Sequence, residues 1–212
     1  MHIPPGFLKP QIWMPMSVIS ASGIGYALRQ TNRLIDDRKV PLMGVMAAFI
    51  FAAQMINFPV VAGTSGHLVG ATLATVILGV WPAMVVMTAV LIVQALLFQD
   101  GGLDALGANV FNMCIWGCLI SGAVMATTRR FGPRCFYPSV AVAGWLSVFG
   151  AAIFCGLELA ASGTSPFLIV VPAMAGIHAI IGVFEGIISI IALRFIRSLI
   201  RETGIHSVGD GR

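Results

Sequence analysis

Residues 40–99 read VPLMGVMAAFIFAAQMINFPVVAGTSGHLVGATLATVILGVWPAMVVMTAVLIVQALLFQ and contain no Asp, Glu, Lys or Arg. As one helix this stretch would extend about 90 Å, which is three times the roughly 30 Å thickness of the hydrocarbon core of a bilayer. Two groups of Gly and Pro residues, Asn57 to Gly66 and Gly79 to Pro82, interrupt it, and such residues terminate helices. The stretch therefore predicts three consecutive membrane crossings.

Charge-free segments recur along the whole chain of 212 residues, of which 58% are hydrophobic and 9% charged. This composition is typical of an integral membrane protein. Period-two alternation is absent, so we expect no strands and no membrane barrel. We predict an all-α protein with seven transmembrane helices in one polytopic membrane domain (residues 1–200), followed by a tail (residues 201–212). The predicted helices span about 12–28, 41–60, 67–80, 83–99, 105–128, 138–159 and 172–198, with ends uncertain by roughly 2 to 4 residues.

Basic residues indicate the orientation of these helices. They lie at or just after the ends of the first, fifth and seventh predicted helices, which all end on the same side of the membrane. The three clusters comprise Arg29, Arg33, Arg38 and Lys39, then Arg129, Arg130 and Arg134, then Arg194, Arg197 and Arg201. Because cytoplasmic loops are enriched in Lys and Arg, we expect the N-terminus outside and the C-terminal tail in the cytoplasm. This pattern accounts for the net charge of +4, and we predict no nucleic-acid partner.

The beginning of the chain carries a metal-binding pattern. The α-amine of Met1, the backbone amide of His2 and the His2 Nδ1 atom can form adjacent chelate rings on one ion. An imidazole from His67 can complete a planar set of four nitrogens, which suits Ni(II) or Cu(II). Pro and Gly residues at positions 4 to 6 forbid a helix there. We therefore predict that residues 1–11 enter the helix bundle as a metal-chelating segment.

A cleavable signal peptide is the alternative interpretation of the first segment. Lys9 precedes an apolar run, and Ser20-Ala21-Ser22 resembles a cleavage site. We expect the segment to be retained, because the run is long for a signal peptide and basic residues follow it. Retention preserves the proposed ligands Met1 and His2.

The position of His67 places the site at membrane depth. The predicted helix 67–80 is only about 21 Å long, so it would begin well below the outer surface. A helix N-terminus disfavours a cation, and ionisation of the His2 amide together with nearby acceptor groups would compensate for this. Polar side chains in apolar segments are the candidates for those groups: Gln54, Asn57, Ser65, Gln94, Asn109 and Asn112. The alternative is that these side chains only join helices together.

Four segments resemble the CbiM/NikM family: MHIPPGFL (1–8), QMINFPVVAGTSGHL (54–68), QALLFQDGG (94–102) and LGANVFNM (106–113). The resemblance implies a heptahelical substrate-binding subunit of an energy-coupling-factor transporter in a prokaryotic cell membrane. It also implies that Met1, His2 and His67 bind Ni²⁺ or Co²⁺, with no organic cofactor. The implied partners are a transmembrane coupling subunit (CbiQ/NikQ-like), ATPase subunits (CbiO/NikO-like) and a small auxiliary membrane subunit. From the resemblance we expect an acidic residue in many members at the position where this chain has Pro5.

Two other functions are less well supported by the residues. The chain has no phosphate-binding loop of the G-x-x-x-x-G-K-[S/T] type, so ATP hydrolysis would require separate subunits. It also lacks a recognisable pairing of nucleophile and base, and we expect no enzyme activity. An autonomous proton-coupled metal carrier that uses Glu158, His178 and Glu185 is the main alternative. We interpret Cys114 and Cys118 as packing residues rather than as soft-metal ligands.

Overall fold

The computed structural model describes residues 1–35, 39–60 and 64–203. Arg38, Gly63 and residues 204–212 of the predicted tail lie outside the described residues. Seven helical segments form within them, as predicted. The segments are α1 (Pro10–Leu34), α2 (Val40–Met55), α3 (Ala71–Leu78), α4 (Val80–Leu97), the continuous run of α5 (Leu106–Asn109), the π-helix η3 (Val110–Trp116) and α6 (Gly117–Thr128), then α7 (Phe136–Ala161) and α8 (Phe167–Thr203). Two short 3₁₀ turns, η4 (Arg129–Phe131) and η5 (Pro133–Cys135), connect α6 to α7.

Proline and glycine set several of the helix ends. Pro10 is the first residue of α1, and Pro41 lies in the first turn of α2, where a helix does not need the missing N–H group. Gly79 has a φ of 89° and separates α3 from α4. The predicted break at Gly79 is therefore confirmed, although it is a tight turn rather than a loop.

The expectation of no strands is wrong after α2. β1 (Phe58–Val60) pairs antiparallel with β2 (Thr64–Gly66), and Pro59 lies opposite Ser65. Pro59 keeps the residue before it out of the helical region, so α2 ends at Met55 instead of reaching residue 60. Strands of three residues are too short to show an alternating pattern in the sequence.

The third helix is shorter than predicted and begins later. α3 has eight residues, which corresponds to about 12 Å, and starts at Ala71 rather than at His67. Gly70 caps it with a left-handed φ of 81°, and the carboxylate of Glu185 accepts hydrogen bonds from the N–H groups of Val69 and Gly70. His67 consequently lies in an extended segment and not in the first turn of a helix.

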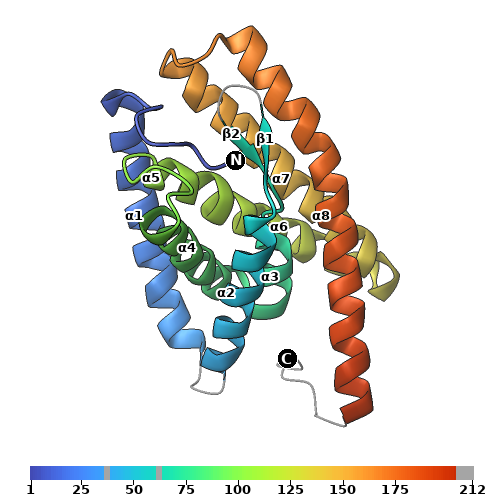
Figure 1. Ribbon diagram of the computed structural model, residues 1–212. Coiled ribbons are helices and arrows are strands. Elements are labelled where there is room, and N and C mark those ends of the chain that lie inside the picture. Colours follow the sequence, from blue (N-terminus) through green and yellow to red (C-terminus); the bar gives the residue numbers. More distant parts are fainter. Residues whose placement is uncertain (36–38, 61–63, 204–212) are drawn as a thin grey trace.

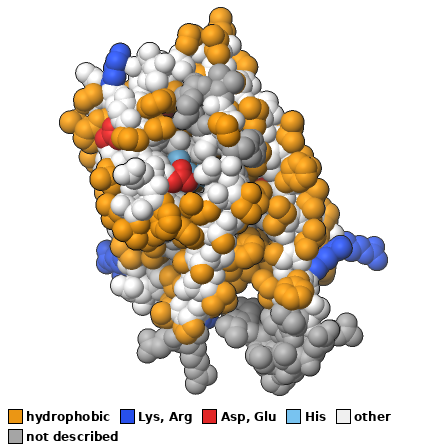
Figure 2. Space-filling model, viewed as in Figure 1, with side chains coloured by type: hydrophobic (Ala, Val, Ile, Leu, Met, Phe, Trp, Pro, Cys, Tyr) orange, Lys and Arg blue, Asp and Glu red, His pale blue; other side chains and the backbone are white. Residues whose placement is uncertain are grey.

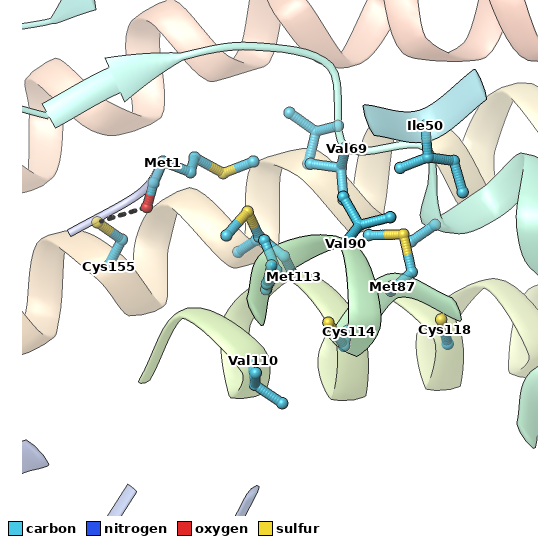
Figure 3. Packing of buried hydrophobic residues seen from close by; sticks show 14 of the residues in the cluster. Met1, Ile50, Val69, Met87, Val90, Val110, Met113, Cys114, Cys118 and Cys155 are labelled. Carbon is cyan, nitrogen blue, oxygen red and sulfur yellow. Dashed lines mark hydrogen bonds between the residues drawn. The ribbon is translucent and has the colours of Figure 1, made fainter. Parts of the chain in front are cut away.

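The helices surround the beginning of the chain. In Figure 1, α1 forms one flank, α7 and α8 pack along each other on the opposite side, and the N-terminus lies between them beside the β-hairpin. Met1 and Ile3 are fully buried and belong to the hydrophobic core. Figure 3 shows Met1 packed near Met113 and Cys155. The first residues are thus part of the interior, as predicted.

Four helical stretches of the described residues are long and apolar enough to cross a membrane. They are Val80–Leu97, Leu106–Phe131, Pro133–Ala161 and Phe167–Ser198, and α2 is a shorter apolar helix. Large apolar side chains cover the outer faces, as the orange surface in Figure 2 shows. The guanidinium group of Arg197 lies 4.1 Å from the ring centre of Phe136, so the second and third basic clusters lie at one end of the molecule.

Candidate metal centre

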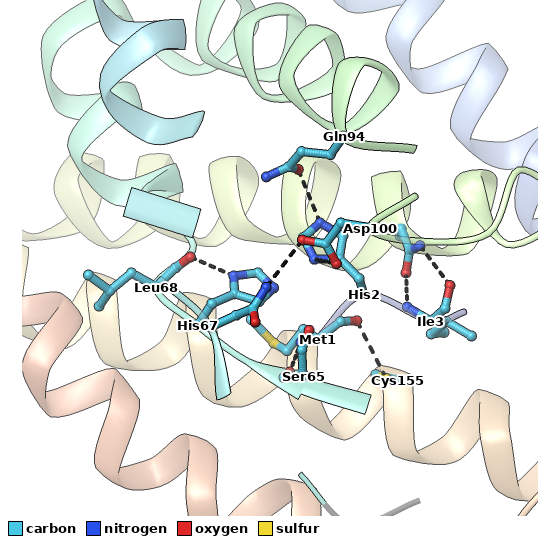
Figure 4. Close-up of polar contacts among 11 residues, drawn as sticks. Met1, His2, Ile3, Ser65, His67, Leu68, Gln94, Asp100 and Cys155 are labelled. Carbon is cyan, nitrogen blue, oxygen red and sulfur yellow. Dashed lines mark hydrogen bonds and ion pairs between the residues drawn. The ribbon is translucent and has the colours of Figure 1, made fainter. Parts of the chain in front are cut away.

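The N-terminal segment is fixed inside the bundle by hydrogen bonds to its backbone. The Met1 amine donates to the carbonyl oxygen of Ser65 and lies 3.2 Å from the Ser65 hydroxyl. The Ile3 N–H donates to Asn109 Oδ1 at 2.9 Å, while the Ile3 carbonyl accepts from Gly102 N at 2.8 Å. These contacts hold the amine and the first peptide bonds beside the loop that carries His67 (Figure 4).

Residues further along the segment are held at the end of α7. The Lys9 N–H donates to Ser162 Oγ at 3.2 Å, and the Thr164 hydroxyl donates to the Phe7 carbonyl. Gly6 N–H donates to Asp104 Oδ2 at 2.8 Å. The segment therefore passes from the α7–α8 turn into the bundle.

The hydrogen-bond partner of His67 fixes which of its ring nitrogens is free. Nδ1 lies 2.7 Å from the Leu68 carbonyl oxygen, and because a carbonyl can only accept, Nδ1 carries the hydrogen. Nε2 is then left with an unprotonated lone pair. This atom is buried without a partner among the described residues, and the side chain is 1% exposed. A buried imidazole nitrogen of this kind is available to a metal ion.

His2 presents the complementary arrangement. Its Nε2 lies 3.1 Å from Gln94 Oε1, so with the amide oriented as in Figure 4 this nitrogen carries the hydrogen and Nδ1 is free. Nδ1 lies 3.2 Å from Asp100 Oδ1 but makes no hydrogen bond within the described part of the chain. The His2 and His67 rings are stacked, with centres 4.5 Å apart and planes 21° apart. A ring nitrogen's lone pair lies in the plane of its ring, and two stacked planes do not meet at one ion between them, so one ring must rotate for both nitrogens to bind it.

Burial keeps all three groups neutral at pH 7. It lowers the pKa of the Met1 amine from 8.0 to about 5, although the acidic side chains Cys155 and Asp100 oppose the shift. It lowers the pKa of His2 to about 3, and the adjacent amine adds to the effect. The pKa of His67 also falls well below 6.5, first through burial and then through the same amine. Neutral amine and imidazole nitrogens are the forms that bind metals.

The predicted supporting side chains all contact this region except Asn112. Gln54 Nε2 donates to the Val69 carbonyl at 2.7 Å, and Asn57 Nδ2 donates to Asp100 Oδ2 at 3.4 Å. Ser65, Gln94 and Asn109 contact the N-terminal segment directly, as described above. Asn112 instead donates to Glu158 Oε2 at 2.7 Å.

Two acidic residues have positions that sequence reasoning missed. Asp100 faces His2, and the sequence signalled it by its place as the first charge after the apolar run 40–99 and within the segment 94–102 that resembles the family. Glu185 was interpreted as a possible proton carrier, but its two oxygens lie 2.9 and 2.7 Å from the N–H groups of Val69 and Gly70. It compensates the partial positive charge at the start of α3, which the sequence predicted would need compensation.

The groups assigned to the proton-coupled carrier each have a hydrogen-bond partner of their own. His178 Nδ1 donates to the Met174 carbonyl at 2.8 Å, and within the described ranges no hydrogen bond joins any two of Glu158, His178 and Glu185. Cys114 and Cys118 are fully buried in the apolar core. No group of three or more His, Cys, Asp or Glu side chains that could hold a metal occurs in residues 1–35, 39–60 and 64–203. A site built on His2 and His67 therefore depends on backbone and terminal nitrogens.

A cavity of about 270 Å³ lies over this centre. His2, Asn57, Ser65 and Asp100 contribute to its lining. Figure 2 shows histidine surface beside an acidic side chain on the face drawn there. The centre thus has an opening toward the outside of the molecule.

Comparison with known proteins places the chain among metal transport proteins. Residues 2–202 match the family model described as "cobalt uptake substrate-specific transmembrane region". A putative fused nickel transport protein NikMN of Archaeoglobus fulgidus is 38% identical over 89% of this chain, which spans only 63% of that relative. A putative metal transport protein of Haloquadratum walsbyi is 39% identical over 89% of this chain and 86% of the relative. A crystal structure of a transition metal transporter is 30% identical, with a TM-score of 0.89 over 97% of this chain and 96% of that one.

Proposed function

Because it matches that model over nearly its whole length, the chain belongs to the CbiM family of cobalt-uptake transmembrane components, and we propose that it captures Ni²⁺ or Co²⁺ for ATP-driven uptake. This membership confirms the predicted family. It also confirms the predictions that the chain is a multi-pass membrane protein and a transport component rather than an enzyme. In our proposal the chain is the substrate-specificity subunit. The relatives named above come from prokaryotes, and we place the chain in a prokaryotic cell membrane.

One observation carries the proposal. Two buried imidazoles each use one ring nitrogen in a hydrogen bond, which leaves His2 Nδ1 and His67 Nε2 as lone-pair donors near a neutral Met1 amine. The His2 N–H donates to no described residue, so the amide nitrogen is the fourth candidate donor. Four nitrogens in a plane favour Ni(II), while Co(II) uses the same donors with lower affinity.

The proposed orientation follows from the two ends of α7. Arg197 packs on Phe136 at its beginning, whereas Lys9 of the N-terminal segment bonds to Ser162 just beyond its end. With the basic end in the cytoplasm, the N-terminal segment faces outside and receives the ion there. We propose a coupling subunit (CbiQ/NikQ-like), ATPase subunits (CbiO/NikO-like) and an auxiliary membrane subunit as partners.

Nickel titration of the purified protein with its native N-terminus tests the ligand set. His67→Ala removes one donor, and one residue added before Met1 displaces the amine, so each change should abolish tight binding. His178→Ala is the control, because it removes a fully buried histidine that borders the centre at the Ser65 backbone but supplies none of the proposed donors, so tight binding should persist. Equal loss in all three variants would show that the ligand set is wrong.

Reconstitution separates this function from that of a proton-coupled carrier. Vesicles that contain the chain with coupling and ATPase subunits should accumulate nickel only when ATP is present. Accumulation by the chain alone along a proton gradient would contradict the proposal and favour the carrier that uses Glu158, His178 and Glu185.

A further inference from the structure

A second pair of donor atoms lies at the surface side of the proposed centre. His2 Nδ1 is buried, carries no hydrogen in the tautomer set by Gln94, and lies 3.2 Å from Asp100 Oδ1. The carboxylate oxygen is also an acceptor. Two acceptor atoms that face each other repel unless a cation lies between them.

Their separation suits a shared metal ion. Two ligand atoms at right angles on an octahedral ion, each with a bond of about 2.1 Å, are about 3.0 Å apart. The observed 3.2 Å between Nδ1 and Oδ1 is close to this value. The pair can therefore hold one divalent ion with little movement of either side chain.

The cavity gives a hydrated ion access to this pair. Asp100 is 17% exposed and lines the cavity of about 270 Å³ together with His2. Since one water occupies roughly 30 Å³, the cavity has room for several waters around an ion. Asn57 donates to the second Asp100 oxygen at 3.4 Å and orients the carboxylate toward His2.

We propose that Asp100 Oδ1 and His2 Nδ1 form a capture subsite for a hydrated divalent transition-metal ion. This inference rests on the proposed function and adds a step before the planar nitrogen set is reached. His2 belongs to both sites, so the ion exchanges its Asp100 oxygen and its waters for nitrogens without leaving His2. The ring rotation that His2 and His67 require for convergence would move the ion from Asp100 toward His67.

Stopped-flow mixing of NiCl₂ with the purified protein, followed by the absorbance of the nickel–nitrogen complex, tests the subsite. Asp100→Asn should slow association about tenfold, the lower end of what electrostatic capture supplies. Because the subsite lies on the path in both directions, dissociation should slow by a similar factor and the Kd should change little. Asp100→Glu retains the charge and should restore most of the association rate, which also excludes misfolding as the cause.

Asp104→Asn is the matched control, because it removes the same charge from a carboxylate of the same loop that accepts from Gly6 and Ala105 and is absent from the cavity lining. Its association rate should stay near that of the unsubstituted chain, whereas the lost contact to Gly6 or Ala105 should appear only as faster dissociation. Unchanged rates in Asp100→Asn, or a weaker Kd with unchanged association, would overturn the subsite while the proposed function stands. Failure of the unsubstituted chain to bind nickel would overturn both.

Discussion

The two histidines of the centre are prepared for metal binding by ordinary hydrogen bonds. A backbone carbonyl fixes the tautomer of His67, and a side-chain amide fixes that of His2. Such outer partners orient a ligand, and their loss typically costs 10- to 100-fold in affinity. The neutral state of both rings and of the Met1 amine then follows from burial.

The buried amine predicts how many protons nickel binding releases. Between pH 5 and 8 a Met1 amine exposed to water binds more protons than the docked amine, which is the one buried in the bundle. Docking of the amine therefore becomes more favourable as the pH rises through this window and less favourable as the pH falls toward 5. At pH 7 the docked amine is already neutral, and only the His2 amide should lose a proton. We expect about one proton released per ion at pH 7, measured by titration calorimetry in buffers of different ionisation enthalpy.

Acidification to below pH 5 should raise the number of protons released per nickel ion toward two, because the Met1 amine is then protonated before the metal binds. Measurements at pH 9 are the control, since the amine is neutral there whether docked or not. Release of about two protons at pH 7 would contradict a docked, neutral amine.

The residues of the centre could be predicted from the sequence because polar groups are rare in so apolar a chain. Met1, His2 and His67 were expected to meet, and the structure brings them together. The partner of His2, Asp100, is separated from it by nearly half the chain, and Glu185 lies 116 positions from Val69. Pairings of this kind depend on how helices pack, which local pattern does not specify.

At the scale of elements, the loop that carries His67 is held from two helices. Gln54 of α2 donates to the Val69 carbonyl, and Glu185 of α8 accepts from the Val69 and Gly70 N–H groups. The sequence predicted the break between α2 and α3 from its Gly and Pro residues, but not the β-hairpin or the late start of α3. The hairpin depends on the pairing of β1 with β2, and the late start of α3 depends on the carboxylate of Glu185 from α8.

Glu185→Gln should therefore loosen the loop without touching the proposed ligands. The amide presents only one acceptor to two N–H groups, and an unsatisfied buried group costs about 1–3 kcal/mol. We expect nickel affinity to fall about 10- to 100-fold and the Val69 and Gly70 amides to exchange hydrogen faster. Glu158→Gln is the control, because Asn112 donates to a single oxygen there. Unchanged exchange at Val69 and Gly70 would refute this role for Glu185.

The docking of the N-terminal segment depends on a close backbone approach at Gly102. A Cβ atom at this position would lie 2.6 Å from the backbone of Pro5, which cannot give way as a flexible side chain could. Gly102→Ala should therefore displace residues 1–5 and weaken nickel binding, by about 10- to 100-fold, in a titration. Gly44→Ala is the control, since its Cβ meets nothing within 4 Å. Equal affinity in the two variants would contradict the proposed role of docking.

On the scale of the whole molecule, composition and helix breakers were sufficient to predict seven helices, because membrane thickness restricts the length of each crossing. The lengths themselves were less predictable. α3 is about 12 Å long, whereas the 37 residues of α8 extend about 55 Å and exceed the bilayer. The short helix is possible because the N-terminal segment and the hairpin occupy the space above it, as Figure 1 shows.

The position of the basic residues predicts the orientation of this whole assembly. α7 spans 26 residues, about 39 Å, so Phe131 and Ala161 near its two ends should lie on opposite sides of the membrane. Both are exposed, and Cys135→Ser gives a suitable background because Cys114, Cys118 and Cys155 are fully buried. In intact cells a membrane-impermeant maleimide should label Ala161→Cys, whereas Phe131→Cys should react only after permeabilisation. The reverse pattern would place the N-terminal segment in the cytoplasm, and a centre that captures metal from outside would then be impossible.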